Sequence, residues 1–163
     1  MTETTVLDQQ KSRSDLTLQV SRIIHAERSR VYQAWTRPEL ITQWFAPGKT
    51  ISSITADPRP GGEYRFEFFG LPCDADVHAP QVPSAVNVTG VYKDVVPDER
   101  ISYTWQGSNF PDEHTLVTVE FKDAPGGTEV TITHENFASA EVMNQHNRGW
   151  EGCLTSLENF LKK

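Results

Sequence analysis

The sequence predicts an α+β protein in which a curved seven-stranded antiparallel sheet wraps around one long C-terminal helix. Three observations predict this class. Short segments that alternate between apolar and polar residues recur along the chain, and turns rich in Gly, Pro and Asp separate them. A stretch with helical spacing follows the first of these segments, and a much longer one follows the last. Because short turns join most successive strands, the sheet should be antiparallel.

The first strand is predicted near residue 16, where Leu16 and Leu18 alternate with polar residues. Residues 1–14 are polar and contain no apolar run, so we expect a flexible tail that is not a signal peptide. Residues 15–163 should form a single domain, because a chain of 163 residues is long enough to bury one hydrophobic core.

The charge balance excludes two classes of partner. A net charge of −7 and a pI near 5.2 argue against nucleic acid or an anionic membrane surface as the main partner. No segment approaches the roughly 20 apolar residues that span a bilayer. Cys73 and Cys153 are isolated in the sequence and are interpreted as reduced thiols, so we expect a cytoplasmic protein.

Two short helices are predicted after the first strand. The apolar face of the first carries Val31, Ala34 and Trp35. The second is predicted to begin at Thr36, which would form a capping box with Glu39 and has Pro38 in its first turn. Its apolar face carries Leu40, Ile41 and Trp44, and Pro47-Gly48 should end it.

Six consecutive strands are predicted in the middle of the chain, within the segments ISSITADP, EYRFEFFG, SAVNVTGVYKDVV, RISYTWQ, HTLVTVEFKD and TEVTITHEN. The linker GLPCDADVHAPQVPSA, residues 70–85, contains three prolines and is longer than a hairpin needs. Long loops in compact domains are often lids or binding loops, so this linker is a candidate for either role.

The last element should be a helix from about Ser139, a good N-cap residue, to Lys162. Gly149 and Gly152 flank Trp150 inside it, and each glycine costs an exposed helix about 1 kcal/mol relative to alanine. We interpret the two glycines as positions where the helix backbone approaches one wall closely while Trp150 points into the interior.

A twisted seven-stranded sheet curls, and a helix that crosses its concave side cannot touch every strand. Large side chains, water or a ligand must therefore fill the space between them. The inward positions are aromatic and aliphatic with a few polar groups, which is typical of a small-molecule site. The predicted ligand-binding residues are Trp44, Tyr64, Phe66, Phe68, Tyr92, Tyr103, Trp105, Val117, Ile132, His134, Met143, His146 and Trp150.

Five segments, AERSRVYQAWTRPELITQWFAP, GGEYRFEF, GVYKDVVPDERISYTW, GGTEVTITHENF and RGWEGCLTSLENFL, resemble the START-like, or SRPBCC, superfamily. Within it, the chain is similar to the group named after the C-terminal domain of the activator of heat-shock protein 90 ATPase. The resemblance implies a helix-grip fold with a deep cavity under the long helix. It also implies that the cavity holds a lipid, sterol, polyketide or other apolar molecule, and a few relatives catalyse cyclisation or aromatisation there.

No sequence motif indicates a particular catalytic chemistry. The GxSxG, HExxH, GxxxxGK[ST] and GxGxxG patterns are all missing from the sequence. His134 is the most interesting single residue, because counting in twos from Val130 places it on the inner face, where it could act as a general base. A histidine on an apolar face is more often a satisfied core residue, and the same holds for His146. No catalytic residue is therefore assigned.

The run CDADVH in the linker offers Asp74, Asp76 and His78, whose oxygens and imidazole are plausible metal ligands. Carboxylates on a Pro-rich loop are usually solvated and do not make a preformed site. We therefore predict no metal and no cofactor.

Three functions remain open at this stage. The leading one is binding of a small hydrophobic ligand. The second is a polyketide cyclase- or aromatase-like enzyme in which His134 and Tyr103 carry acid–base chemistry. The third is an interaction module for a chaperone, which would be favoured by clustered exposed residues such as Phe69 and Phe110. The eukaryotic activator makes its main contact through a separate N-terminal domain, so a chaperone partner ranks below a ligand. Edge strands could also pair into a homodimer.

Overall fold

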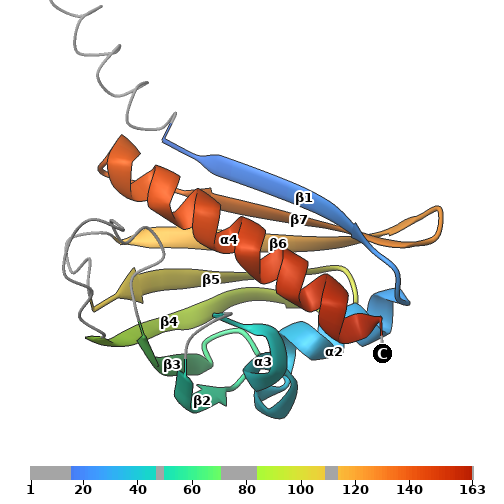
Figure 1. Cartoon of the computed structure of the whole chain (residues 1–163), viewed down its shortest axis with the longest axis horizontal. Coiled ribbons are helices and arrows are strands. Elements are labelled where there is room, and N and C mark those ends of the chain that lie inside the picture. Colours follow the sequence, from blue (N-terminus) through green and yellow to red (C-terminus); the bar gives the residue numbers. More distant parts are fainter. Residues whose placement is uncertain (1–15, 47–49, 71–83, 109–113, 163) are drawn as a thin grey trace, which may run out of the picture.

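The computed structural model describes residues 16–46, 50–70, 84–108 and 114–162 of the chain. Seven strands and three helices follow one another in the predicted order (Figure 1). They are β1 (Leu18–Ile24), α2 (Arg28–Thr36), α3 (Pro38–Trp44), β2 (Thr50–Ala56), β3 (Glu63–Gly70), β4 (Ser84–Val96), β5 (Arg100–Gly107), β6 (Thr115–Ala124), β7 (Gly127–Glu135) and α4 (Ala140–Leu161). The predicted α+β class is confirmed.

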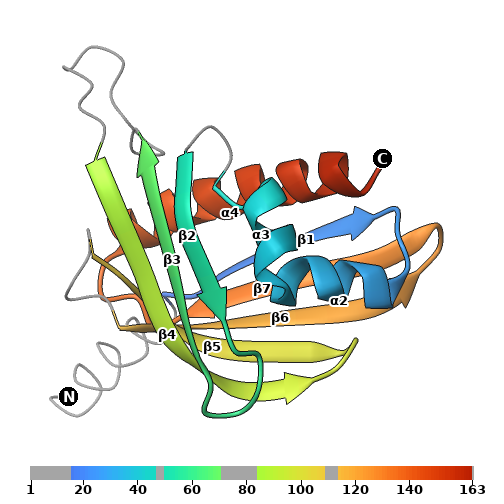
Figure 2. The ribbon, with the colours of Figure 1, turned by 90° about the horizontal axis from the view of Figure 1, so that it is seen from below.

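All seven strands form one antiparallel sheet in the order β1-β7-β6-β5-β4-β3-β2. Consecutive strands from β2 to β7 are neighbours, as expected from hairpin-like connections. The first strand pairs with the last, with Val20 opposite Ile132. Figure 2 shows the sheet bending so strongly that β2 and β3 stand at a steep angle to β6 and β7. This curvature creates the concave face that the helices cover.

The long helix α4 crosses the concave face, as Figure 1 shows. Its 22 residues span about 33 Å. Ser139 is the N-cap and accepts a hydrogen bond from the Val142 amide at 3.4 Å, as predicted. The buried side chains recur at helical spacing and form one stripe: Trp150, Cys153, Leu154, Leu157 and Leu161. Gly149 and Gly152 are partly exposed, and their interpretation as sites of close approach remains a prediction.

The helices α2 and α3 cover the end of the concave face that α4 leaves open (Figure 2). Trp35 on α2 and Trp44 on α3 are both buried. The indole Nε1 of Trp44 donates to the Ala34 carbonyl at 2.8 Å, which ties α3 to α2. The predicted capping box is wrong. The hydroxyl of Thr36 donates back to the Tyr32 carbonyl, so α2 continues through Thr36 and Arg37 is the N-cap of α3.

The ladder between β4 and β5 opens at Gly90 and Val91. Thr89 pairs with Gln106 and Tyr92 with Tyr103, but the two positions between them make no regular pairs. Side chains replace the missing backbone bonds: the Val91 amide donates to the Thr104 hydroxyl, and Tyr64 donates to the Thr104 carbonyl. A Cβ at Gly90 would lie 1.9 Å from that carbonyl oxygen. Only glycine fits this junction, where the sheet bends.

Several predictions fall on residues outside the described ranges. They include the tail, most of the 70–85 linker with Cys73 and the candidate metal ligands Asp74, Asp76 and His78, and Phe110. Only the two ends of the linker are described, and they belong to β3 and β4.

Candidate functional site

The predicted site residues all come together on the inner side of the sheet and under the helices. Trp44, Tyr64, Phe66, Tyr92, Tyr103, Trp105, Val117, Ile132, His134 and Trp150 are buried. Phe68, Met143 and His146 are partly buried at the end of the interior near the start of α4. The alternation of inward and outward positions therefore identified the inner face correctly. Arg65 and Glu67, which alternate with the buried positions of β3, form an exposed ion pair at 3.0 Å on the outer face.

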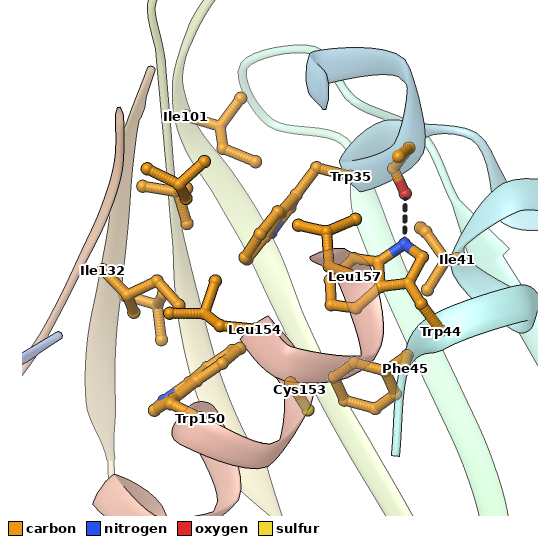
Figure 3. Close-up of a cluster of buried hydrophobic side chains, with 14 of the residues drawn as sticks. Trp35, Ile41, Trp44, Phe45, Ile101, Ile132, Trp150, Cys153, Leu154 and Leu157 are labelled. Atoms are coloured by element: carbon orange, nitrogen blue, oxygen red, sulfur yellow. Dashed lines mark hydrogen bonds between the residues drawn. The ribbon is translucent and has the colours of Figure 1, made fainter. Parts of the chain in front are cut away.

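Aromatic and aliphatic side chains fill the interior (Figure 3). A cavity of about 10 Å³, roughly the space for one water molecule, lies between these side chains. Its lining consists of Trp35, Ile41, Trp44, Phe45, Tyr64, Phe66, Tyr92, Tyr103 and Trp150. The expectation of a deep, open hollow is therefore wrong for this structure. The helix does leave a gap over the curved sheet, but rings from α2 and α3 occupy it.

Three residues that line the cavity, Trp35, Ile41 and Phe45, were not among the predicted ligand-binding residues. Phe45 follows α3 directly, and its ring centroid lies 4.9 Å from that of Phe66, 5.9 Å from Phe68 and 6.3 Å from Trp105. Trp35 stacks at 6.3 Å on Trp150 and lies 4.7 Å from Trp44. The apolar spacing of α2 identified Trp35 as buried. Nothing in the local pattern indicated that Phe45 would fill the gap.

His134 is completely buried and lies in a chain of hydrogen bonds. The Trp150 indole Nε1 donates to its Nδ1 at 3.0 Å, and its Nε2 lies 2.7 Å from the Thr115 hydroxyl. That hydroxyl donates to the Trp105 carbonyl at 2.9 Å. An indole N–H can only donate, so Nδ1 must carry a lone pair and the proton sits on Nε2. His134 is therefore a neutral imidazole with both nitrogens satisfied.

Burial lowers the pKa of His134 well below its usual range, and the nearby His146 lowers it further. A second proton on His134 would have to face the N–H of Trp150, which offers no lone pair. The geometry and the pKa thus agree on a neutral side chain. For acid–base chemistry at His134, Trp150 would first have to move away.

Three tyrosines cluster beside the cavity. The ring centroid of Tyr64 lies 5.2 Å from Tyr103 and 5.7 Å from Tyr92, and Tyr92 lies 5.7 Å from Tyr103. The Tyr103 hydroxyl accepts a hydrogen bond from the Trp35 indole Nε1 at 3.3 Å. Burial raises the pKa of all three phenols above their ordinary value. These hydroxyls therefore remain protonated donors across the physiological range.

His146 lies between the buried interior and the surface. Its ring centroid is 5.2 Å from His134, 5.2 Å from Phe137 and 6.4 Å from Trp105. Its Nδ1 lies 2.9 Å from the Val142 carbonyl, one turn earlier in α4, and therefore donates to it. His146 thus forms part of the aromatic wall at the start of α4.

A larger hollow of about 1190 Å³ lies on the other side of the sheet, at the bend. Outward-facing side chains line it, among them Arg65, Thr89 and Gln106. It is wide and open, and about half of its lining is polar. Because ligand sites are usually enclosed and largely apolar, we do not regard this hollow as the candidate site. The interior aromatic cluster fits that description better, although its free volume is far smaller.

The described part of the chain contains no group of three His, Cys, Asp or Glu side chains that could hold a metal ion. Within the same ranges, no helix combines the length and apolar character needed to cross a bilayer.

A curved antiparallel sheet closed by a long C-terminal helix, with an aromatic interior between them, defines the helix-grip fold of START-like proteins. The sequence comparison specifies the family. The model of the activator of Hsp90 ATPase homolog 1-like proteins matches residues 25–162, and the chain belongs to this family. Among curated proteins, none matches the chain.

Solved structures from several bacteria share the fold. A protein from Chromobacterium violaceum is 24% identical, with a TM-score of 0.74 over 90% of this chain and 98% of that one. An uncharacterised protein from Rhizobium leguminosarum is 29% identical, with a TM-score of 0.69 over 90% and 93% of the two chains. DynU16, a protein of the dynemicin biosynthetic locus, is 17% identical, with a TM-score of 0.66 over 90% of this chain and 47% of that one.

Proposed function

We propose that this protein binds a small hydrophobic molecule in the interior between β3–β5, α3 and α4. The observation that carries the proposal is the composition of that interior. Aromatic rings from three helices and the sheet meet around a water-sized cavity, and no salt bridge between described residues lies within it. Such a lining binds aromatic and other apolar groups because it buries their apolar surface and matches their shape.

Because the interior is closed, the ligand must take the place of a side chain. Phe45 is the best candidate, since it lies at the end of α3 next to the partly buried Phe68. Its neighbour Ala46 has a φ of 51°, a conformation that costs a residue with a Cβ about 1–2 kcal/mol. Moving Phe45 out of the interior would allow the backbone at Ala46 to relax. We therefore expect the interior to open at this segment.

The cost of opening can be bounded. Exposing a phenylalanine side chain costs about 1.5–3 kcal/mol, which corresponds to an open population of roughly 1–10%. The measured association constant of a ligand is the intrinsic constant of the open form multiplied by this open fraction. We therefore expect the wild-type protein to bind a benzene-sized probe about 10- to 100-fold more weakly than a variant in which the space is already open.

The experiment compares wild type, Phe45→Ala and the control Phe69→Ala by calorimetric titration with ethylbenzene. Phe69 is 49% exposed on the opposite face of β3, so its removal should leave binding unchanged. Phe45→Ala should lose about 3–5 kcal/mol of stability and bind ethylbenzene more tightly. Saturable binding by wild type is the essential result. If only Phe45→Ala binds, the site is an engineered cavity and the proposal is refuted.

An enzyme of the cyclase or aromatase kind is the alternative, and the similarity to DynU16, from a biosynthetic locus, is the observation that favours it. His134 and Tyr103 would carry the chemistry. Both nitrogens of His134 are already hydrogen-bonded, which argues for a structural role. Replacing His134 with Gln, which can both donate and accept, should leave turnover of an offered polyketide unchanged if the role is structural.

The interaction-module hypothesis needs an exposed apolar cluster. Phe69 is the exposed large apolar residue within the described ranges. A single such residue is normal for a protein surface. A pull-down from native cytosol that enriches a chaperone, and loses it with Phe69→Ala, would support this function over ligand binding.

A further inference from the structure

Three of the buried polar side chains around the interior donate to acceptors within the protein. The indole N–H of Trp44 donates to the Ala34 carbonyl, and that of Trp150 donates to His134. The hydroxyl of Tyr64 donates to the Thr104 carbonyl. Each of these donors has an acceptor within the protein. None of them is available to a ligand unless an existing hydrogen bond breaks.

Tyr103 differs from these residues. It is 4% exposed and lines the cavity of about 10 Å³ together with Trp35. Its oxygen accepts from the Trp35 indole at 3.3 Å, but no described residue accepts the proton of its own hydroxyl. A phenol is both a donor and an acceptor, so half of its hydrogen-bonding capacity is unused. Burying a donor without an acceptor is unfavourable, and buried tyrosines usually find a partner.

The other tyrosines do not share this property. Tyr64 has its acceptor at the bend of the sheet. Tyr92 also has no acceptor among the described residues, but its hydroxyl oxygen is not fully buried, because every fully buried side-chain nitrogen or oxygen among them has a hydrogen-bond partner. Water can therefore accept its proton. Burial also raises the pKa of Tyr103, with smaller contributions from Tyr92 and Cys153, so its proton is retained. Tyr103 is thus a permanent donor at the cavity wall.

We infer that the ligand of the interior site carries a hydrogen-bond acceptor, a carbonyl or ether oxygen on an aromatic or alicyclic body, and that the Tyr103 hydroxyl donates to it. This inference rests on the proposed function and narrows its ligand class. A purely hydrocarbon ligand would leave the Tyr103 proton without a partner. When no ligand is bound, one water molecule in the small cavity accepts the same proton, and the ligand oxygen replaces it.

The test uses acetophenone and ethylbenzene, two probes of nearly the same shape that differ in one carbonyl. Wild type should bind acetophenone about 3- to 10-fold more tightly than ethylbenzene, the range expected for one neutral hydrogen bond. The variant Tyr103→Phe should remove this preference. The preference is a ratio within each protein, so any loss of stability from leaving the Trp35 indole unpaired cancels. Tyr92→Phe is the matched control and should keep the full preference.

The carbonyl stretch of 13C-labelled acetophenone provides a second measurement that needs no variant. A hydrogen bond from Tyr103 should shift this band to lower frequency in wild type, relative to acetophenone in an apolar solvent. If both probes bind wild type equally and the band does not shift, the inference is overturned while the proposed function stands. If neither probe binds, the proposed function fails and the inference fails with it. If Tyr103→Phe keeps the wild-type preference, Tyr103 is not the donor.

Discussion

Replacing Thr115 with valine should destabilise the protein far more than its size suggests. Valine and threonine have nearly the same shape and both favour strands, so the packing on β6 is unchanged. The valine cannot accept from the His134 Nε2–H, nor donate to the Trp105 carbonyl. The substitution therefore leaves the buried His134 Nε2–H without an acceptor and removes one hydrogen bond to the Trp105 carbonyl, which keeps its place in the strand ladder.

The orphaned donor should cost about 1–3 kcal/mol and the lost bond to the carbonyl about 0.5–1.5 kcal/mol, so we expect Thr115→Val to lower the free energy of unfolding by about 1.5–4.5 kcal/mol. For a domain of this size that corresponds to a Tm lower by about 3–18 °C. The control is Thr118→Val on the same strand. The side chain of Thr118 is partly buried and lies outside the chain of hydrogen bonds around His134. Urea unfolding followed by tryptophan fluorescence measures both. If Thr115→Val loses stability within about 0.5 kcal/mol of what the control loses, the chain of hydrogen bonds through Thr115 and His134 is refuted.

Two further predictions follow from the same structure. Burial lowers the pKa of His134 below 6.5, so the unfolded chain takes up this proton first. The stability that neutral His134 contributes should be fully present above pH 6.5 and decline below it, by at most about 1.4 kcal/mol per pH unit. Urea titrations at pH 5–7 measure how the free energy of unfolding changes with pH. This pH dependence should be weaker in His134→Gln than in wild type, and an equal pH dependence in the two proteins would contradict a neutral, buried His134. Gly90→Ala should cost more than about 3 kcal/mol, because its Cβ would meet the Thr104 carbonyl oxygen. Gly61 has a φ of +85° and open space around it, so Gly61→Ala should cost only about 1–2 kcal/mol in the same assay. If the two variants lose the same stability, the close contact at Gly90 is disproved.

The fold could be predicted from the sequence because its signals are local and repeated. Alternation in segments such as EYRFEFFG fixes which side chains share a face, and the turn residues fix the antiparallel order. The N-cap at Ser139 was likewise predictable from its own neighbourhood. The capping box at Thr36 failed because its hydroxyl had a competing acceptor one turn earlier, the Tyr32 carbonyl, which pattern alone does not exclude.

Whether the interior is open or filled could not be predicted, since this depends on contacts between residues that are distant in the sequence. The inner face of each strand was correct, yet the volume left inside depends on how Phe45 and Trp35 pack against strands far along the chain. The partners of His134 are 16 and 19 residues away, on α4 and β6. The opening of the β4–β5 ladder at Gly90 could likewise not be predicted, because it depends on contacts with Tyr64 and Thr104 on other strands.

The most direct test is a two-dimensional NMR titration of the wild-type protein with acetophenone, following the indole N–H signals of its four tryptophans. Three of these N–H groups donate inside the core, from Trp35, Trp44 and Trp150. If the closed interior opens to admit a small molecule, the Trp35 and Trp150 signals should shift in a saturable way. Signals that stay fixed up to the solubility limit of the probe would mean that the aromatic core is simply a solid core.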